Sequence, residues 1–310
     1  MRGVVSTRAN FSRRWEGFWR LADPKISLAS MSSILIGAAA AWRHGSLDWS
    51  WFLLTVAGIF CLEVAKNASG ELFDFDTDSA VRPEDRSPFS GGKRVLVDNL
   101  LTRWETALIA ATGYALGITC GLLIVAFRST DVFWWGLVGV ACAFFYNAPP
   151  LKLSYRGLGE VAVALCYGPL IATGTFLVQR GSLSRDVVLV SIPLGLLIGA
   201  FLWINEFPDS AADRAARKYN LVVRLGRLRA SRIFAGIVAI AFALLVLWPF
   251  FGLPFTIWLG ALALPVALAA VRTLWRYPET TARIIPAQAK ALLAFVVLAI
   301  GVGIGVAIPR

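Results

Sequence analysis

Histidine and cysteine are scarce in this sequence. Its 310 residues include one histidine, His44, and four cysteines, Cys61, Cys120, Cys142 and Cys166. A single histidine in a predicted loop excludes catalysis that depends on a buried histidine, and it excludes a histidine-rich metal site. The cysteines lie far apart without paired spacing. They predict small buried side chains rather than a disulfide framework or a thiolate metal site.

Polar sequence is also limited, because 57% of the residues are hydrophobic. That fraction is too high for an ordinary soluble domain. A helix needs about 20 mostly apolar residues to cross a bilayer, and the alternating segments of a transmembrane β-barrel are absent. We predict an all-α polytopic membrane protein with nine transmembrane helices. The predicted spans are 26–42, 49–67, 105–127, 131–149, 159–179, 186–206, 230–252, 254–275 and 287–308.

Acidic residues are outnumbered by basic ones, 19 to 30, which gives a formal net charge of +11. If the N-terminus is cytoplasmic, 25 of the 30 Lys and Arg lie at or beyond the cytoplasmic ends of the nine predicted helices. This asymmetry follows the positive-inside rule and supports the number of helices. The basic excess then lies near anionic lipid. We therefore predict an integral protein of the inner or plasma membrane, without a nucleic-acid partner.

The N-terminal segment, residues 1–25, has a different character from the rest. Phe11, Trp15, Phe18 and Trp19 recur at helical spacing among several arginines. This pattern is typical of a helix that lies on the cytoplasmic membrane surface, and it lacks the apolar core and cleavage site of a signal peptide. We expect this interfacial helix to precede a membrane domain formed by residues 26–310.

The scarce acids gather in two segments, 70–78 (GELFDFDTD) and 205–213 (NEFPDSAAD). Both contain the pattern E-x-x-D-x-x-x-D at an offset of 135 residues. Glu71, Asp74 and Asp78 of the first segment match Glu206, Asp209 and Asp213 of the second. Each segment follows a long apolar run whose end is predicted to be cytoplasmic. The recurrence at equivalent positions indicates an internal duplication.

Carboxylates at this spacing share one face of a helix, so each segment is expected to direct three of them into a cavity. Hard divalent cations take oxygen ligands, and Mg²⁺ is usually held by one or two carboxylates together with substrate phosphates. Two facing acidic segments therefore indicate Mg²⁺ bound with a diphosphate. The alternative is a set of solvated acids paired with nearby arginines. A cation transporter is disfavoured because no acid is expected at mid-helix depth.

Basic residues near both acidic segments are available to bind a polyanion. A diphosphate at the edge of an apolar helical cavity indicates a prenyl diphosphate as substrate. Tyr146 and Tyr155 are suited to stabilise an allylic cation, or they form an interfacial aromatic belt. The basic candidates are Arg82, Arg86, Lys93, Arg94, Lys152, Arg156, Arg214, Lys218 and Arg224.

These features resemble the UbiA superfamily of intramembrane prenyltransferases. That family has Asp-rich motifs of the form N-D-x-x-D-x-x-x-D and D-x-x-x-D after its second and sixth helices. Here they match residues 70–78 and 209–213 (DSAAD). Residues 145–181, which contain YRGLGE and a later G-P…G-T…VQ series, and residues 213–226 (DRAARKYNLVVRLG) are similar in particular to 1,4-dihydroxy-2-naphthoate polyprenyltransferases of menaquinone synthesis.

The resemblance implies a Mg²⁺-dependent prenyltransferase with nine helices around a central cavity. It implies that Asp74, Asp78, Asp209 and Asp213 hold Mg²⁺ and the diphosphate, with help from Glu71. It also implies electrophilic substitution, in which the diphosphate leaves and the electron-rich ring of an aromatic acceptor, 1,4-dihydroxy-2-naphthoate or a related quinone precursor, attacks the allylic cation. The candidate substrate-binding residues are Asn67, Glu71, Arg86, Lys93, Tyr146, Lys152, Arg156, Asn205 and Lys218.

The sequence departs from the family pattern at several places, including Tyr219 and Asn220 and a shorter loop between Asp78 and Arg86. Gly70 stands where Asn is usual, Glu71 where Asp is usual, and Arg217 where Gly is frequent. These departures leave other reactions open on the same scaffold. One is cyclisation of a prenyl diphosphate without an acceptor. Another is transfer to a different acceptor, such as homogentisate, hydroxybenzoate, a sugar phosphate or a glycerol lipid.

Overall fold

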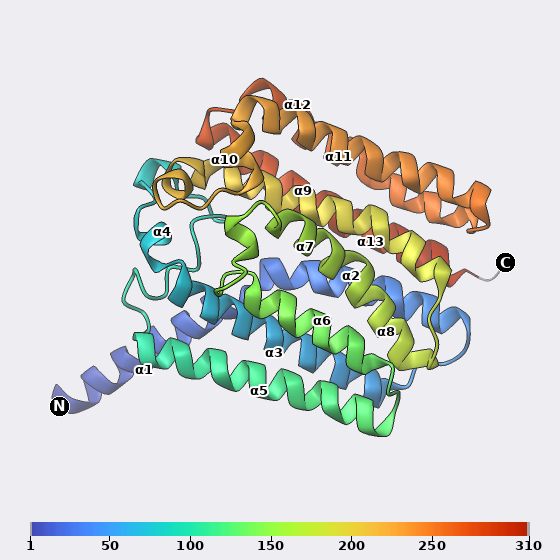
Figure 1. Cartoon of the computed structure of the whole chain (residues 1–310), viewed down its shortest axis with the longest axis horizontal. Coiled ribbons are helices and arrows are strands. Elements are labelled where there is room, and N and C mark those ends of the chain that lie inside the picture. Colours follow the sequence, from blue (N-terminus) through green and yellow to red (C-terminus); the bar gives the residue numbers. More distant parts are fainter. Residues whose placement is uncertain (1, 309–310) are drawn as a thin grey trace.

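The chain folds into a bundle of helices (Figure 1). The computed structural model describes residues 2–308, with side chains from residue 11 onward. Over this range the only β-type pairing is one isolated bridge between Ser87 and Ser90. The predicted all-α fold is confirmed.

The α-helices within the described range are α1 Arg2–Ala22, α2 Pro24–Arg43, α3 Trp49–Phe73, α4 Phe75–Ser79, α5 Arg103–Phe127, α6 Val132–Phe145, α7 Gly159–Leu165, α8 Ile171–Arg180, α9 Arg185–Ala215, α10 Leu221–Leu225, α11 Arg227–Leu247, α12 Leu264–Arg276 and α13 Thr281–Ala307. The 3-10 segments are η1 Pro83–Asp85, η2 Leu153–Tyr155, η4 Trp248–Phe251 and η5 Phe255–Ala263. A π-helical turn, η3 Cys166–Leu170, joins α7 to α8.

Each of the nine apolar runs predicted from the sequence contains a helical segment. Between residues 2 and 308, eight helical segments are long and apolar enough to cross a membrane. The ninth run corresponds to α6, which has 14 residues. A helix of that length extends about 21 Å, less than the roughly 30 Å of a hydrocarbon core. The difference from the prediction is therefore one short helix.

The long helix α9 forms the centre of the bundle and packs against α7, α11 and α13 (Figure 1). Its side chains Leu194, Phe201 and Phe207 are at most 3% exposed. The ring of Phe201 contacts that of Phe295 on α13 edge to face, with centroids 5.5 Å apart. This buried packing fixes the direction in which the second acidic segment leaves the apolar core.

Small residues hold α3 and α5 together. A Cβ atom at Gly113 would lie 2.8 Å from the carbonyl oxygen of Cys61, and one at Gly117 would lie 2.6 Å from Leu62 Cγ. Close approach through small residues is a common way to pack membrane helices. It fixes α3, which ends at the first acidic segment.

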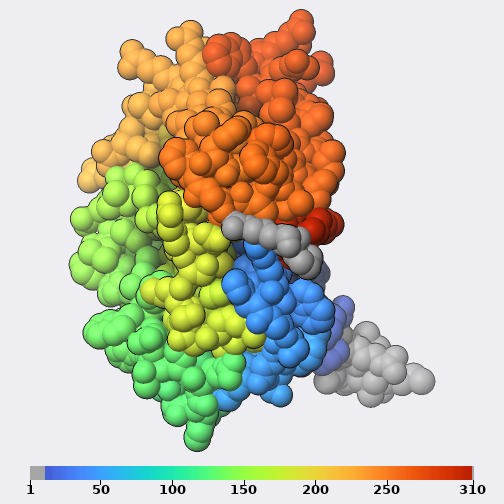
Figure 2. Space-filling model, turned by 90° about the vertical axis from the view of Figure 1, so that its right-hand side faces the viewer, coloured from blue at the N-terminus to red at the C-terminus, as the bar shows by residue number. Residues whose placement is uncertain are grey.

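The connections after α3, α6 and α9 gather at one end of the bundle, where α4 and α10 lie (Figure 1). The Gly91 N–H, on the connection that follows α4, donates to Asp209 near the end of α9, and the Tyr219 N–H donates to the Tyr155 carbonyl oxygen at 3.1 Å. Figure 2 shows the opposite end, with C-terminal segments in orange above an N-terminal segment in blue and segments from the middle of the chain in green and yellow. The two acidic segments therefore emerge on the same side.

Candidate active site

The first acidic segment continues the line of α3. Although α3 ends at Phe73, the Asp74 N–H donates to the Gly70 carbonyl at 2.8 Å, and the Asp78 N–H donates to the Asp74 carbonyl at 2.9 Å. These bonds keep the helical register through α4. Asp74 and Asp78 are both 7% exposed, so their carboxylates lie inside the protein, as the spacing predicts.

Lys218 joins the two acidic segments. Its Nζ lies 3.5 Å from Asp74 Oδ2 and 3.6 Å from Asp213 Oδ1. Its backbone N–H donates to the Asp213 carbonyl at 2.8 Å, and the preceding Arg217 makes the turn with φ of 58°. Burial alone would lower the pKa of Lys218, but Asp213, Asp74 and Asp78 outweigh it and raise that pKa well above its ordinary value. The side chain therefore carries its charge.

Neutral donors orient the two carboxylates that contact Lys218. Asp74 accepts hydrogen bonds from the Asn147 amide and from the Tyr155 hydroxyl, the latter at 3.0 Å. Asp213 accepts one from Asn220 Nδ2 at 2.8 Å. Burial and the nearby Asp74 raise the pKa of Tyr155 to about 12, so its hydroxyl stays protonated and donates. These donors fix the direction in which each carboxylate points.

A connection that we call the covering loop, residues 80–96, lies over the other two aspartates. The Gly91 N–H donates to Asp209 Oδ2 at 2.7 Å. At Gly92, where φ is 71°, a Cβ atom would lie 2.0 Å from Asp78 Oδ2, so only glycine permits this approach. Burial raises the pKa of Asp78 well above its ordinary value, against the opposing effect of the nearby ammonium.

Several buried oxygen atoms at this end accept no hydrogen bond from any described residue. They are Asn205 Oδ1, Glu206 Oε2, Asp209 Oδ1 and Asp213 Oδ1. Unpaired buried acceptors are costly and call for a partner. Among the residues that the structure describes, no group of three or more His, Cys, Asp or Glu is placed to hold a metal ion. Oxygen atoms from one or two carboxylates are available instead.

Glu71 has a different environment from the other acids. Its Oε1 accepts the N–H groups of Lys93 and Arg94 at 2.6 and 2.9 Å, and its Oε2 accepts those of Val95 and Leu96 at 2.7 and 3.4 Å. Four donors occupy the carboxylate, which is 4% exposed. Glu71, predicted to assist with metal, thus binds the end of the covering loop.

Two more predicted residues contact groups outside the acidic cluster. Asn67 donates its amide to the Leu21 carbonyl at 2.7 Å, which ties α3 to the end of α1. Lys93 pairs with Asp23 through its side chain. Both side chains thus join α3 and the covering loop to the N-terminal helices.

The remaining basic candidates lie near the surface. Arg156 is exposed and donates to the Pro150 carbonyl at 2.9 Å. Lys152 Nζ lies over the Tyr155 ring, 4.6 Å from its centroid. Arg86 is exposed, and its side chain has no ion pair or hydrogen bond to the described part of the chain. Of the predicted cations, Lys218 is the one that the structure brings between the aspartates.

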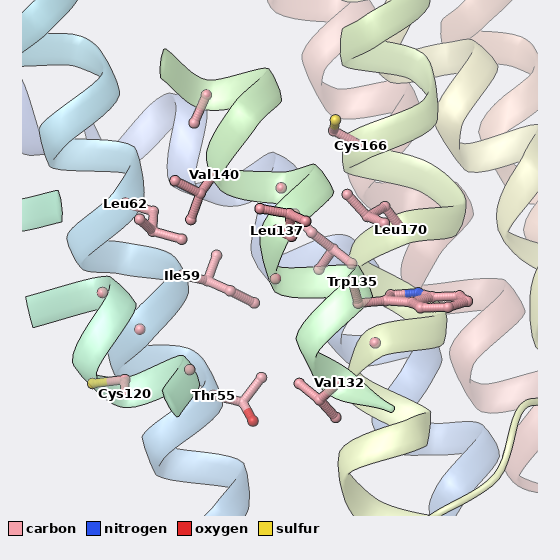
Figure 3. Close-up of a pocket in the computed structure, with 18 of the residues that line it drawn as sticks. Thr55, Ile59, Leu62, Cys120, Val132, Trp135, Leu137, Val140, Cys166 and Leu170 are labelled. Atoms are coloured by element: carbon pink, nitrogen blue, oxygen red, sulfur yellow. The ribbon is translucent and has the colours of Figure 1, made fainter. Parts of the chain in front are cut away.

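An apolar cavity of about 350 Å³ lies between α3, α5, α6 and the α7–α8 segment (Figure 3). Thr55 and Val132 line one end of it, and Leu137 and Val140 line it farther along (Figure 3). Along α3 it extends from Lys66 to Leu54, twelve residues or about 18 Å. The other end is polar and is lined by Glu63, Lys66, Tyr146 and Tyr167.

The expectation that no acid lies at mid-helix depth is wrong. Glu63 lies within α3, is 5% exposed and lines the cavity, as does Lys66 one turn later. A prediction that takes the run 49–67 as uniformly apolar does not identify Glu63 and Lys66 as candidate functional residues. The signal was available, since an ionisable residue inside a predicted span is by default a functional candidate.

Comparison with curated proteins finds relatives over most of the chain. The 1,4-dihydroxy-2-naphthoate octaprenyltransferase of Bacillus subtilis (strain 168) is 26% identical over 228 residues, which cover 72% of this chain and 70% of that protein. The protein of the same name from Escherichia coli (strain K12) is 27% identical over 266 residues, 84% and 85% of the two chains.

Solved structures share the fold. The apo structure of a UbiA homolog from Aeropyrum pernix K1 aligns with a TM-score of 0.70 at 19% identity, over 89% of this chain and 96% of that one. A UbiA homolog from Archaeoglobus fulgidus bound to GPP and Mg²⁺ aligns with a TM-score of 0.60 at 15% identity, over 92% and 99%.

The family match extends over most of the sequence. The family model described as "UbiA prenyltransferase family" matches residues 30–296. The predicted enzyme class, a prenyltransferase, is confirmed, and the protein is an integral membrane protein. The chain belongs to the UbiA prenyltransferase family.

Proposed function

We propose that the protein transfers a polyprenyl group from its diphosphate to an aromatic acceptor, 1,4-dihydroxy-2-naphthoate or a related quinone precursor. The names of the bacterial relatives support this acceptor. So does a 2-carboxy-1,4-naphthoquinone phytyltransferase from Synechocystis, which is 27% identical over 217 residues.

One observation carries the proposal: an ionic site opens next to an apolar cavity. Asp74, Lys218 and Asp213 form the ionic site. Asn147, which binds Asp74, directly follows Tyr146 in the cavity wall. A molecule with a charged head and a long apolar tail fits this combination, and a prenyl diphosphate is such a molecule.

We propose that Asp74, Asp78, Asp209 and Asp213 hold Mg²⁺ with the diphosphate. The residues fit a hard cation, because the available donors are oxygen atoms and Asp209 Oδ1 and Asp213 Oδ1 are buried without a hydrogen bond. Mg²⁺ commonly uses one or two carboxylates plus phosphate oxygens, so a larger cluster of protein ligands is not required. When bound, it would neutralise charge on the departing diphosphate.

The chain's own groups would do the rest of the work. The Lys218 ammonium is positioned to bind diphosphate oxygens, and exposed Arg86 is available on the covering loop. The ring faces of Tyr146 and Tyr155 would stabilise the allylic cation. The apolar cavity would hold the tail and keep water from the cation. In this assignment Glu71 positions the covering loop rather than metal.

The placement in the membrane is also a proposal. With 25 of 30 Lys and Arg at or beyond the helix ends on one side, the positive-inside rule places the N-terminus and the active-site loops in the cytoplasm. On α1, Phe11, Trp15 and Trp19 are 69%, 53% and 45% exposed. These rings suit insertion into the cytoplasmic surface of the bilayer, with residues 1–25 as an interfacial helix beside the 26–310 membrane domain.

The test is diphosphate release by purified protein with geranylgeranyl diphosphate and Mg²⁺, with and without 1,4-dihydroxy-2-naphthoate. We expect release only with the acceptor, together with a prenylated naphthoquinone by mass spectrometry. Release without acceptor, accompanied by a new hydrocarbon or alcohol, would replace the transferase with a terpene cyclase.

A further inference from the structure

The cavity wall contains a buried acid, Glu63, whose carboxylate has hydroxyl groups around it but accepts no well-formed hydrogen bond from them. Glu63 is 5% exposed, and neither carboxylate oxygen accepts a hydrogen bond from any described residue. The groups close enough to interact electrostatically with its carboxylate are the Lys66 ammonium and three hydroxyls, those of Ser27, Ser30 and Tyr167. A buried carboxylate without hydrogen bonds is costly, so a bound ligand that donates to it would recover free energy.

Lys66 follows Glu63 by three residues and lines the same cavity. Side chains at this spacing on a helix are neighbours and often pair. Here no ion pair within 4.0 Å joins Glu63 to Lys66 or to any other side chain that the structure describes. Lys66 Nζ instead lies over the Tyr146 ring, 4.7 Å from its centroid. The Glu63 carboxylate and the Lys66 ammonium thus line one cavity without forming an ion pair with each other.

Glu63 and Lys66 lie between the apolar part of the cavity and the ionic site. Asp74 follows Lys66 by eight residues on α3 and its continuation, about 12 Å along the axis. Tyr146, against Lys66, adjoins Asn147, which binds Asp74. A ring seated here would lie near the point where a prenyl tail joins its diphosphate.

We propose that Glu63 and Lys66 form a subsite that selects the acceptor as an aromatic hydroxy acid. Glu63 accepts a hydrogen bond from a ring hydroxyl, and Lys66 binds the ring carboxylate. A ring hydroxyl that donates a hydrogen bond to a carboxylate releases more electron density into its ring. The ring then attacks an allylic cation more readily. This inference rests on the proposed function and adds to it the chemical groups that the acceptor must carry.

The experiment combines two variants with acceptor analogues. Glu63→Gln keeps the shape but removes the charge. We expect it to raise the KM for 1,4-dihydroxy-2-naphthoate about 10- to 100-fold, since a hydrogen bond to a charged group contributes about 1.5–3 kcal/mol. The KM for geranylgeranyl diphosphate should not change. With analogues that lack one hydroxyl in turn, the effect of Glu63→Gln should disappear for the analogue that lacks the hydroxyl bound by Glu63.

Lys66→Met tests the other half of the subsite. We expect it to raise the KM for the hydroxy acid about tenfold or more, and to change that for 1,4-dihydroxynaphthalene, which has no carboxylate, less than threefold. Glu279→Gln, whose side chain is 70% exposed, is the matched control and should behave as wild type. If Glu63→Gln does not fold, Glu63→Asp replaces it, with the same dependence on the hydroxyl.

Equal losses with every analogue, or an unchanged acceptor KM, would overturn the subsite and leave Glu63 a structural role. Failure of the proposed function has a different signature, namely no wild-type turnover with any acceptor. In that case, binding of 1,4-dihydroxy-2-naphthoate without prenyl diphosphate, measured by calorimetry, decides the matter. Weaker binding by Glu63→Gln than by the wild type would support the proposed subsite, and equal binding would contradict it.

Discussion

Replacing Lys218 by Met should leave two buried carboxylates without their cation. The Nζ lies 3.5 and 3.6 Å from Asp74 and Asp213. At an effective dielectric constant of about 20, each contact has a Coulomb energy of about 5 kcal/mol. Desolvation offsets much of this sum. Removal of one partner from a buried ion pair costs about 3–5 kcal/mol, and we expect the lower half of that range because Lys218 is 18% exposed.

The assay is thermal unfolding of purified protein in detergent, first in EDTA and then with Mg²⁺. Lys218→Met should lose about 3–4 kcal/mol of stability in EDTA. Mg²⁺ should restore part of this stability, because the metal ion then supplies positive charge between Asp74 and Asp213 that the variant lacks. Lys290→Met, whose side chain makes no ion pair with the described residues, is the control. Unfolding of Lys218→Met at the wild-type temperature in EDTA would refute the view that this ammonium balances the two carboxylates.

Four further outcomes follow from the site. Asp209→Asn should lower turnover at least about 100-fold while the melting temperature holds, because its amide oxygen can still accept the Gly91 N–H; near-normal activity would refute the Mg²⁺ assignment. Turnover should vanish in EDTA and return with Mg²⁺, and persistence in chelator would count against metal-assisted ionisation. Glu71→Gln should destabilise the covering loop by about 3 kcal/mol, seen as faster tryptic cleavage at Arg86; an unchanged rate would contradict its role. Arg217→Gly should raise stability by about 0.5–1 kcal/mol, measured by thermal unfolding, because φ there is 58°; a loss would show that the strain is absent.

Hydropathy predicted the fold well because bilayer-length apolar runs have few alternatives to helices. It overestimated one run, 131–149, where α6 is confined to Val132–Phe145. The last residues of that run form the turn that places Asn147 against Asp74. Local hydropathy does not distinguish a helix end from a turn that carries an active-site side chain.

The pairing of the two acidic segments was also predictable, because spacing and topology placed them at the same end. The identity of their partners was not. Asn147 and Tyr155 donate to Asp74 from the connection between α6 and α7, and Asn220 donates to Asp213 from the connection after α9. Their positions in the sequence do not indicate these pairings. Such partners depend on how loops meet in space, which local patterns do not contain.

The repeated pattern predicts equivalent roles for Glu71 and Glu206, and the structure shows an asymmetry instead. Glu71 accepts four N–H groups from residues 93–96 of the covering loop, whereas Glu206 Oε2 has no hydrogen bond to the described residues. Asp209 of the second segment holds Gly91 of the same loop. One loop is therefore anchored by both acidic segments. A diphosphate bound between the segments would also fix this loop, because any change in their separation must strain one of its two anchors.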